Sequence, residues 1–347
     1  MIPVLPSKKI KIALVGVGNV ACALVQGLNA KNPDGIWHPK VGGFAPRDIE
    51  IVAAFDIDKR KVGKDLSEAI FEPPNVGTRF VDVKPTKVLV SPGIVRPDVP
   101  RHLAGDHAGV DSVVETLKEC GAELLVNLIP SGMQSTSSAY AKQAMDAGVS
   151  FINATPAKVA TDPSVRQRFA KRRLLVVGDD LMSQFGGTAF HKGILNFIDG
   201  RGIKVEKSYQ LDVGGGNETL NTIEEEVKIA KRDIKTESIA EEVPYKFATV
   251  AGTTDYVDYM GNNRTSYFWI SGKGFLGSGI KIDVYLRTND GANAVNVLFD
   301  VVRAAAYCKM KKIYGSPREI CDYGFKKLPK PVMLHQAHED FYSKFVR

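Results

Sequence analysis

The sequence predicts an α/β fold in which a Rossmann-like, doubly wound parallel sheet is interrupted by an α+β domain. Three observations lead to this prediction. An apolar strand over residues 10–15 runs into a glycine turn and then a helix, which is how a dinucleotide-binding unit begins. Strands and helices alternate from there to about Gly178. Beyond that point the strands alternate apolar and polar residues, as half-exposed antiparallel strands do.

The first strand, turn and helix read IKIALVGVGNVACALVQGL. Gly16 permits the tight turn, and Gly18 has no Cβ to keep a phosphate away. Ala21 fills the third small position, so the string is the G/A variant of GxGxxG. Backbone N–H groups and the helix dipole at this turn suit a pyrophosphate, although a tight turn without a ligand would give the same string. The predicted phosphate-binding residues are Gly16, Gly18, Asn19 and Val20.

Length and composition indicate an ordinary globular protein with two domains. The chain has 347 residues, of which 44% are hydrophobic and 24% charged. Its 4 cysteines form no C-x-x-C pair, which predicts reduced core residues and no zinc site. The net charge of +7 is spread along the chain, so we expect anionic small molecules and neither nucleic acid nor a membrane as partners. The first residues lack a signal peptide, and a cytoplasmic location is expected.

The second strand, residues 49–55, follows a polar insertion over residues 29–48 and ends in Asp56. A carboxylate at this place accepts hydrogen bonds from the adenosine ribose and repels a 2′-phosphate, so Asp56 predicts NAD as the cofactor. Asp56 could instead cap the following segment, and Asp58 is an equal candidate for that.

Later strands end in small polar residues that would lie at the cofactor crevice. A loop-rich segment over residues 71–107 is expected to cover the cofactor. A helix over 110–120, a strand over 123–129, a helix over 137–147 and strands over 150–154 and 174–177 follow. The predicted cofactor-binding residues at their ends are Asn127, Pro130, Ser131, Thr155, Asp179 and Asp180. The last two carry oxygens that a divalent or monovalent cation uses, and the sequence leaves a metal requirement open.

The second half predicts a helix over 188–198 and an antiparallel sheet with strands over 205–213, 265–271 and 280–286. A charged helix over 220–232 lies between them, and a long helix over 292–309 follows. The predicted division is an NAD-binding domain over 1–182, a catalytic and oligomerisation domain over 183–291, and a return to the first domain over 292–347.

Several segments together resemble the myo-inositol-1-phosphate synthase family between about residues 9 and 327. They read VGVGNVACALVQG, LVNLIPSG, FINATPAKVA, GDDLMSQFGGTAFHK, YQLDVGGGNETLN, KRDIKT and DVVRAAAYCK. The resemblance implies an NAD-dependent enzyme that converts glucose 6-phosphate to inositol 3-phosphate by oxidation, enolisation, intramolecular aldol closure and reduction. It also implies a homotetramer.

The resemblance assigns catalytic roles to Lys231, Lys235, Arg264, Lys326 and Asp290. Negative charge develops on oxygen during such a reaction, and cations held away from water stabilise it. Lys231 and Lys235 are one helical turn apart, so they project from one face. Their surroundings, EEEVKIAKRDIK, by themselves favour a solvated, salt-bridged helix face, and only the resemblance favours a catalytic role. Asp290 could be a simple turn residue. His191 is expected to be a packed helix residue.

Two departures from the family pattern leave other functions open. Met182 and Arg264 stand where many members have lysine, and arginine hardly ever releases a proton. One alternative is a related synthase that closes a smaller ring from a ketose phosphate such as fructose 6-phosphate. Another is a simple NAD-dependent oxidoreductase, and a third is a regulatory NAD-binding scaffold without catalysis.

Overall fold

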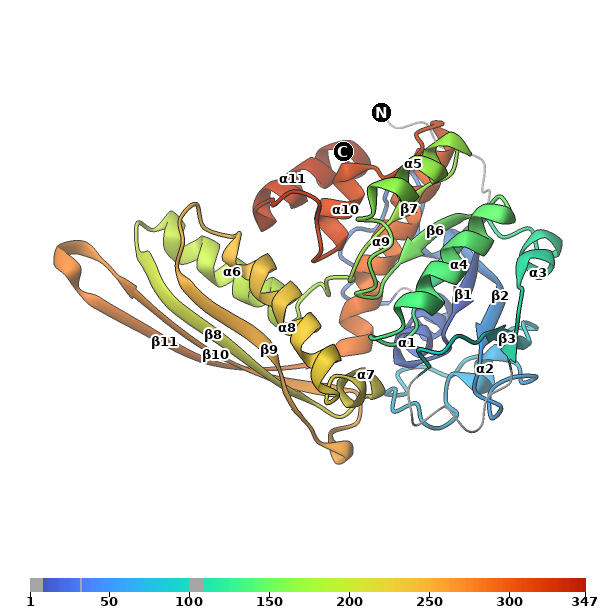
Figure 1. The fold of residues 1–347 in the computed structure, drawn as a ribbon, viewed down its shortest axis with the longest axis horizontal. Coiled ribbons are helices and arrows are strands. Elements are labelled where there is room, and N and C mark those ends of the chain that lie inside the picture. The colour runs from blue at the N-terminus through green and yellow to red at the C-terminus, as the bar shows by residue number, and fades with distance from the viewer. Residues whose placement is uncertain (1–8, 32, 100–108) are drawn as a thin grey trace.

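The structure is a computed structural model that describes residues 9–31, 33–99 and 109–347. It contains a parallel sheet with helices on both faces and a second sheet that extends away from it (Figure 1). This confirms the predicted α/β class with an inserted α+β part. The initial residues, on which the absence of a signal peptide was predicted, and the end of the loop-rich segment lie outside the described residues.

The first sheet has seven strands within the described residues, in the order β4-β3-β2-β1-β5-β6-β7. Its pairings are parallel throughout, and β5 and β6 are buried at every position, which explains their continuous apolar sequences. The strand order reverses between β1 and β5, and the carboxyl ends of these strands border the crevice described below. The strands are β1 (Ile10–Val15), β2 (Ile49–Asp56), β3 (Val90–Ile94), β4 (Gly109–Val110), β5 (Leu124–Asn127), β6 (Ser150–Asn153) and β7 (Val176–Val177).

Helices α1 (Asn19–Asn29), α2 (Leu66–Ala69), α3 (Val114–Glu119), α4 (Gln134–Asp146) and α5 (Pro163–Lys171) connect these strands. The segment 71–107 was predicted to be loop-rich, and the strand β3 within it was not predicted. Strand β3 contains Pro92 and Gly93, residues that usually break strands, but its partner β2 supplies the pairing that the local sequence does not indicate.

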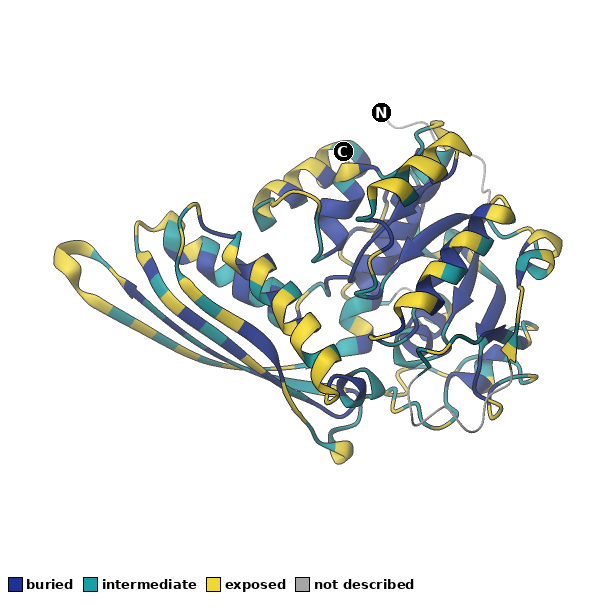
Figure 2. Ribbon diagram, in the orientation of Figure 1, coloured by how far each residue is buried: buried dark blue, intermediate teal, exposed yellow. Residues whose placement is uncertain are grey.

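The second sheet, in the order β11-β10-β8-β9, carries its two longest helices, α6 and α8, on one side (Figure 1). Residues on the helix side are mostly buried, whereas the other side is largely exposed or intermediate (Figure 2). The elements are α6 (Gly187–Gly200), β8 (Lys204–Gly214), α7 (Asn217–Asn221), α8 (Glu225–Ala240), β9 (Ala248–Tyr256), β10 (Asn263–Lys273) and β11 (Gly279–Asn289).

Two predictions for this sheet are wrong. The sheet is mixed, because β8 and the unpredicted strand β9 pair in parallel. The helix α8 carries the chain back along the sheet, which is the crossover that parallel neighbours require. The single helix predicted over residues 220–232 is two helices, α7 and α8. The hydroxyl of Thr222 donates to the carbonyl oxygen of Thr219 and so competes with the backbone where α7 ends.

The chain then returns to the first sheet through α9 (Asp290–Met310), α10 (Arg318–Gly324) and α11 (Leu334–Phe345). Helix α9 packs against α1, and side chains such as Leu24, Phe299 and Phe341 share one core cluster. None of the helices in the described part of the chain is long and apolar enough to cross a membrane.

A fully buried ion pair fixes the insertion before β2 onto α9. Arg303 donates to one Asp300 carboxylate oxygen at 2.5 Å, and to the carbonyl oxygens of His38 and Phe44 at 3.0 and 3.2 Å. The other oxygen of Asp300 lies 2.7 Å from Nδ1 of His38 and accepts from the hydroxyl of Tyr323 at 2.6 Å.

Replacing Arg303 by methionine is therefore expected to lower the free energy of unfolding by about 3 kcal/mol, because a buried carboxylate and several carbonyl groups lose their donor. Arg318→Met is the matched control. Arg318 also pairs with an aspartate on its own helix, but its side chain is 63% exposed, and its loss should cost less than about 1 kcal/mol. Urea unfolding measures both, and equal losses would contradict the assignment.

Candidate active site

A crevice opens between the carboxyl ends of the first sheet and the helix side of the second. Its walls come from the two sheets and from the segment that follows α10. Of the residues predicted from the sequence, twelve line it: Gly16, Gly18, Asn19, Val20, Asp56, Pro130, Thr155, Asp180, Lys231, Arg264, Asp290 and Lys326. The crevice thus brings together most of the predicted cofactor-binding and catalytic residues.

The glycine turn has the geometry that a phosphate requires. Gly16 has a φ of +88°, and a Cβ there would come within 3.0 Å of the backbone of Leu128 and Ile129. A Cβ on Gly18 would meet nothing within 4 Å, so this glycine faces open space. Helix α1 begins without a side-chain cap, which leaves its first N–H groups available to an anion.

Asp56 holds the turn in place. One carboxylate oxygen accepts from the N–H of Val17 at 2.7 Å, and the other accepts from the N–H groups of Ile57 and Asp58 at 2.8 and 2.9 Å. A carboxylate has about four lone-pair sites, so one remains for a ribose hydroxyl. Asp58 instead accepts from the guanidinium group of Arg60.

The loop-rich segment contacts this turn directly. The side-chain amide of Asn75 donates to the carbonyl oxygen of Val17 at 2.8 Å, and the N–H of Val76 donates to the Asn19 side chain at 2.9 Å. Pro74 and Asn75 also line the crevice. Residues 74–76 of this segment therefore lie against the glycine turn, and that the segment covers a cofactor stays a prediction.

Asn127 and Asp179 lie beneath the crevice and do not line it, and both are 0% exposed. Asp179 accepts from the backbone N–H groups of Val159, Ala160 and Thr161, so its carboxylate orders that loop. Asp180 differs, because Oδ1 accepts from the Lys326 ammonium at 2.7 Å while Oδ2 is buried without a partner. Among the described residues, no group of three or more His, Cys, Asp or Glu side chains is placed to hold a metal ion.

Lys231 and Lys235 are buried, with 7% and 2% of their surface exposed, so the alternative of a solvated helix face is wrong for them. Lys231 donates to the carboxylate of Glu218 and, at 3.3 Å, to the hydroxyl of Ser131. Ser131 also donates its N–H and hydroxyl to Glu218. Although burial opposes ionisation, Lys231 and Ser131 lower the pKa of Glu218 to about 2.

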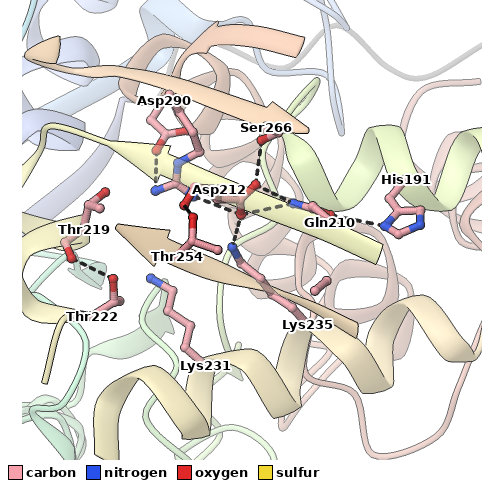
Figure 3. A network of polar contacts seen from close by, with 12 residues as sticks. His191, Gln210, Asp212, Thr219, Thr222, Lys231, Lys235, Thr254, Ser266 and Asp290 are labelled. Carbon is pink, nitrogen blue, oxygen red and sulfur yellow. Dashed lines mark hydrogen bonds and ion pairs between the residues drawn. The ribbon is translucent and has the colours of Figure 1, made fainter. Parts of the chain in front are cut away.

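Asp212 lies at the centre of a second cluster of polar side chains, which it forms with Lys235, Ser266 and Gln210 (Figure 3). It accepts from Lys235 at 2.5 Å, from Ser266 at 2.6 Å and from Gln210 at 2.8 Å. Burial would raise its pKa, but Lys235 and Arg264 hold the pKa of Asp212 well below its usual range. The pKa of Lys235 is lowered by burial, which Asp212 opposes, and by the neighbouring cations. A lysine so perturbed is suited to proton transfer.

Arg264 pairs with Asp290 at 2.7 Å and lies 4.0 Å from Asp212. The first turn of α6, at Gly186 and Gly187, closes a small cavity shared with Lys235, Arg264 and Lys326. Helix α6 has no side-chain cap, so its free N–H groups face three cationic side chains across this cavity. Met182, the other departure from the family pattern, lines a separate apolar cavity with Phe185 and Tyr323.

Sequence reasoning missed Asp212, Glu218, Gln210 and the α6 terminus. A signal was present for two of them. Along β8 the polar residues Ser208, Gln210 and Asp212 alternate with Tyr209 and Leu211, and the polar set is the one that faces the helices. Buried polar residues at every second position of a strand indicate a functional face.

His191 is buried, as predicted, and burial lowers its pKa to about 4. The unfolded chain takes up this proton near pH 6.5, whereas the folded protein takes it up only near pH 4. The free energy of unfolding is therefore highest above pH 6.5 and decreases as the pH falls towards 4. We expect the free energy of unfolding to decrease by about 3 kcal/mol over this interval because of His191, and a His191→Gln variant should not show this contribution. Urea unfolding at several pH values measures it, and identical pH slopes in both proteins would refute the assignment.

The chain is similar in sequence and in fold to known proteins. The family model described as myo-inositol-1-phosphate synthase matches residues 186–291. The chain is 34% identical over 339 residues to inositol-3-phosphate synthase of Mycobacterium tuberculosis, covering 93% of this chain and 92% of that protein. The crystal structure of Ari2 is similar with a TM-score of 0.77 at 28% identity, covering 97% and 99% of the two chains. A myo-inositol-1-phosphate synthase-related protein from Thermotoga maritima shares the fold, with a TM-score of 0.80 at 21% identity over 96% and 98%.

Proposed function

This chain belongs to the myo-inositol-1-phosphate synthase family, and on that premise we propose that it converts glucose 6-phosphate to inositol 3-phosphate with NAD. The observation that carries the proposal is the convergence of four cations from three separate segments. Lys231, Arg264 and Lys326 line a crevice that begins at a dinucleotide-type glycine turn, and Lys235 lines the small cavity that shares Arg264 and Lys326 with it. A simple oxidoreductase needs no such cluster of cations. A scaffold without catalysis would have no reason to bury them.

The residues of the glycine turn fit NAD. The open space at Gly18 and the uncapped α1 terminus suit the pyrophosphate, and Asp56 retains a lone pair for the adenosine ribose. Asn127 and Asp179 would act on the cofactor site indirectly, by ordering the strand ends. When bound, NAD would accept a hydride from the sugar and later return it, so the reaction is redox-neutral.

We place the substrate phosphate in the small cavity at the α6 terminus. Backbone N–H groups of the uncapped α6 terminus and the cations of Lys235, Arg264 and Lys326 line it, which is the chemistry that binds a phosphomonoester. The carboxylates of Asp212 and Asp290 also line this cavity, where they pair with Lys235 and Arg264. A Cβ on Gly187 would lie 2.2 Å from Nε2 of Gln210, so any larger residue there would displace the Gln210 amide.

The catalytic roles follow from the charge of each group. Lys235, whose pKa burial lowers, is the group that we assign to proton transfer at the reacting oxygen. Arg264 stays protonated and is tied to Asp290, so it stabilises oxyanion charge without exchanging a proton. Lys231 and Lys326, each paired with a carboxylate, complete the positive surroundings. The arginine substitution is thus compatible with the reaction, because lysines remain to transfer protons.

We also propose that the chain forms a homotetramer through the uncovered side of the second sheet. Tyr209 stacks on Trp269 there, and Tyr267 lies beside Tyr285, which is 72% exposed. Exposed aromatic clusters of this kind mark interfaces between proteins. Light scattering on Tyr285→Lys should show dissociation, and an unchanged mass would refute the interface.

The four cysteines are free thiols, which supports a reducing, cytoplasmic location.

The proposed reaction is tested by NMR product analysis after incubation of the protein with glucose 6-phosphate and catalytic NAD, with fructose 6-phosphate in parallel. Inositol phosphate without accumulation of NADH is the expected result. A carbocycle formed from fructose 6-phosphate but not from glucose 6-phosphate would show that the substrate is the ketose phosphate. Net release of NADH would favour a simple oxidoreductase, and no turnover with NADH bound would favour a scaffold.

A further inference from the structure

A chain of hydrogen-bonded side chains, buried as far as Ser208, leads from Lys235 along the helix side of the second sheet (Figure 3). Asp212 accepts from the amide of Gln210 at 2.8 and 3.1 Å. The amide oxygen of Gln210 lies 3.3 Å from Nδ1 of His191, whose Nε2 is 3.0 Å from the Ser208 hydroxyl. Ser208 in turn lies 2.8 Å from the hydroxyl of Thr249. The proposed reaction assigns no role to this chain beyond Asp212's contact with Lys235.

The charge of Asp212 determines the direction of every bond in the chain. An ionised carboxylate only accepts, so the NH₂ group of Gln210 must face Asp212 and its oxygen must face His191. Neutral His191 then donates from Nδ1 and accepts at Nε2 from Ser208. Each link therefore has a donor and an acceptor. A fully satisfied buried network of this kind is rigid.

The same carboxylate contacts two of the cationic groups of the crevice. Asp212 lies 2.5 Å from the Lys235 ammonium and 4.0 Å from the Arg264 guanidinium. Ser266 donates to the oxygen that also accepts from Gln210 at 2.8 Å, so the carboxylate is held on one side while its other oxygen faces Lys235. Asp212, which Ser266 and Gln210 hold in place, therefore fixes the position of the Lys235 ammonium group.

We propose that Asp212 is the positioning residue for Lys235, and that Gln210 and His191 act through it to hold the lysine ammonium group at the small cavity by the α6 terminus. The proposal rests on the proposed function for the reaction in which Lys235 takes part. The contact between Asp212 and Lys235 and the hydrogen bonds that hold Asp212 are the same whichever substrate the protein uses.

Five charged groups lie around Lys235, and one of them, Asp290, lines the same cavity but pairs with Arg264. The other four act on the charge of Lys235, and Asp212 is the anion among those four. They are Asp212 on β8, Arg264 on β10, Lys231 on α8 and Lys326 after α10. The three cations and burial favour the neutral amine, while Asp212 favours the ammonium form. Loss of the carboxylate would shift Lys235 towards the free amine and release its side chain.

Asp212→Asn removes the charge and keeps the shape of the side chain. Asp146→Asn is the matched control. Asp146 also pairs with a cation, Arg172, but this pair lies at the surface, where the Asp146 side chain is 39% exposed. The first readout is acetylation of Lys235 by acetic anhydride at a series of pH values, quantified by mass spectrometry on the full chain with NAD present. The second is kcat for glucose 6-phosphate over the same pH range.

In Asp212→Asn the midpoint of Lys235 acetylation should move to lower pH by at least about one unit, and kcat should fall about 100-fold. Asp146→Asn should leave both unchanged. An unchanged acetylation midpoint in folded Asp212→Asn would overturn the proposal. If the wild-type protein does not turn over glucose 6-phosphate, the proposed function fails, but the acetylation result still decides the role of Asp212.

Gln210→Met provides a second test if Asp212→Asn does not fold. Methionine is similar in shape but cannot donate to Asp212 or accept from His191. It leaves the Asp212 charge in place, so the acetylation midpoint should stay near the wild-type value while kcat falls about tenfold. An unchanged kcat in this variant would show that the hydrogen-bond chain does not position Lys235.

Discussion

Lys235→Met is expected to lower kcat for inositol phosphate formation by at least about 10³-fold while NAD binding persists. The variant removes the group assigned to proton transfer and a cation beside the reacting oxygens, and each such contribution is typically worth 10²–10⁴-fold. The glycine turn and Asp56 lie in the first domain and do not contact Lys235, so the cofactor should still bind. NMR product analysis measures turnover, and fluorescence of bound NADH measures the cofactor.

Lys228→Met is the matched control for Lys235. Lys228 lies on the same helix, α8, but its ammonium group donates to the backbone carbonyl of Thr254 at the surface. Its replacement should leave kcat within about twofold, because an exposed contact of this kind contributes little. Comparable losses in the two variants would mean that helix α8 as a whole, and not the buried lysine, is required.

Gly187→Ala is expected to lower kcat/KM for glucose 6-phosphate by about 100-fold and the free energy of unfolding by about 1–3 kcal/mol. The new Cβ would lie 2.2 Å from Nε2 of Gln210 and 3.1 Å from the Ser266 hydroxyl, and both groups hold Asp212. The methyl group would also enter the proposed phosphate cavity. Steady-state kinetics and urea unfolding test the two effects separately.

Gly200→Ala is the control for this substitution, because it lies in the same helix and its added Cβ would meet no atom within 4 Å. Alanine is the better helix former, so stability should be unchanged or higher by up to about 1 kcal/mol, and kinetics should not change. Wild-type kinetics in Gly187→Ala would refute the phosphate site at the α6 terminus.

The two lysine ion pairs divide the second domain's part of the site into two different environments. Lys231 is paired with Glu218, which also binds Ser131 of the first domain and so joins the two walls of the crevice. Lys235 is paired with Asp212 inside the second sheet. Lysines one helical turn apart therefore have different partners. This difference supports separate roles for them in the proposed reaction.

The sequence by itself determined five of the strands of the first sheet, the glycine turn and the family. Continuous apolar strands, a turn that only glycine allows at Gly16, and polar strand ends are local features that short-range sterics and burial impose. The resemblance then supplied Lys231, Lys235, Arg264, Asp290 and Lys326 as catalytic residues. The spacing of the two α8 lysines alone favoured a solvated helix over a site, since spacing does not reveal which face another element covers.

Only the tertiary structure decided which groups surround those cations. Asp212 and Glu218 are separated from Lys235 and Lys231 by 23 and 13 residues, and their pairing depends on how α8 crosses the sheet. The parallel pairing of β8 with β9 sets that crossing, and nothing local in the sequence indicates it. The charge state of a buried lysine depends on its neighbours in space, so the chemistry of this site becomes readable only once the chain is folded.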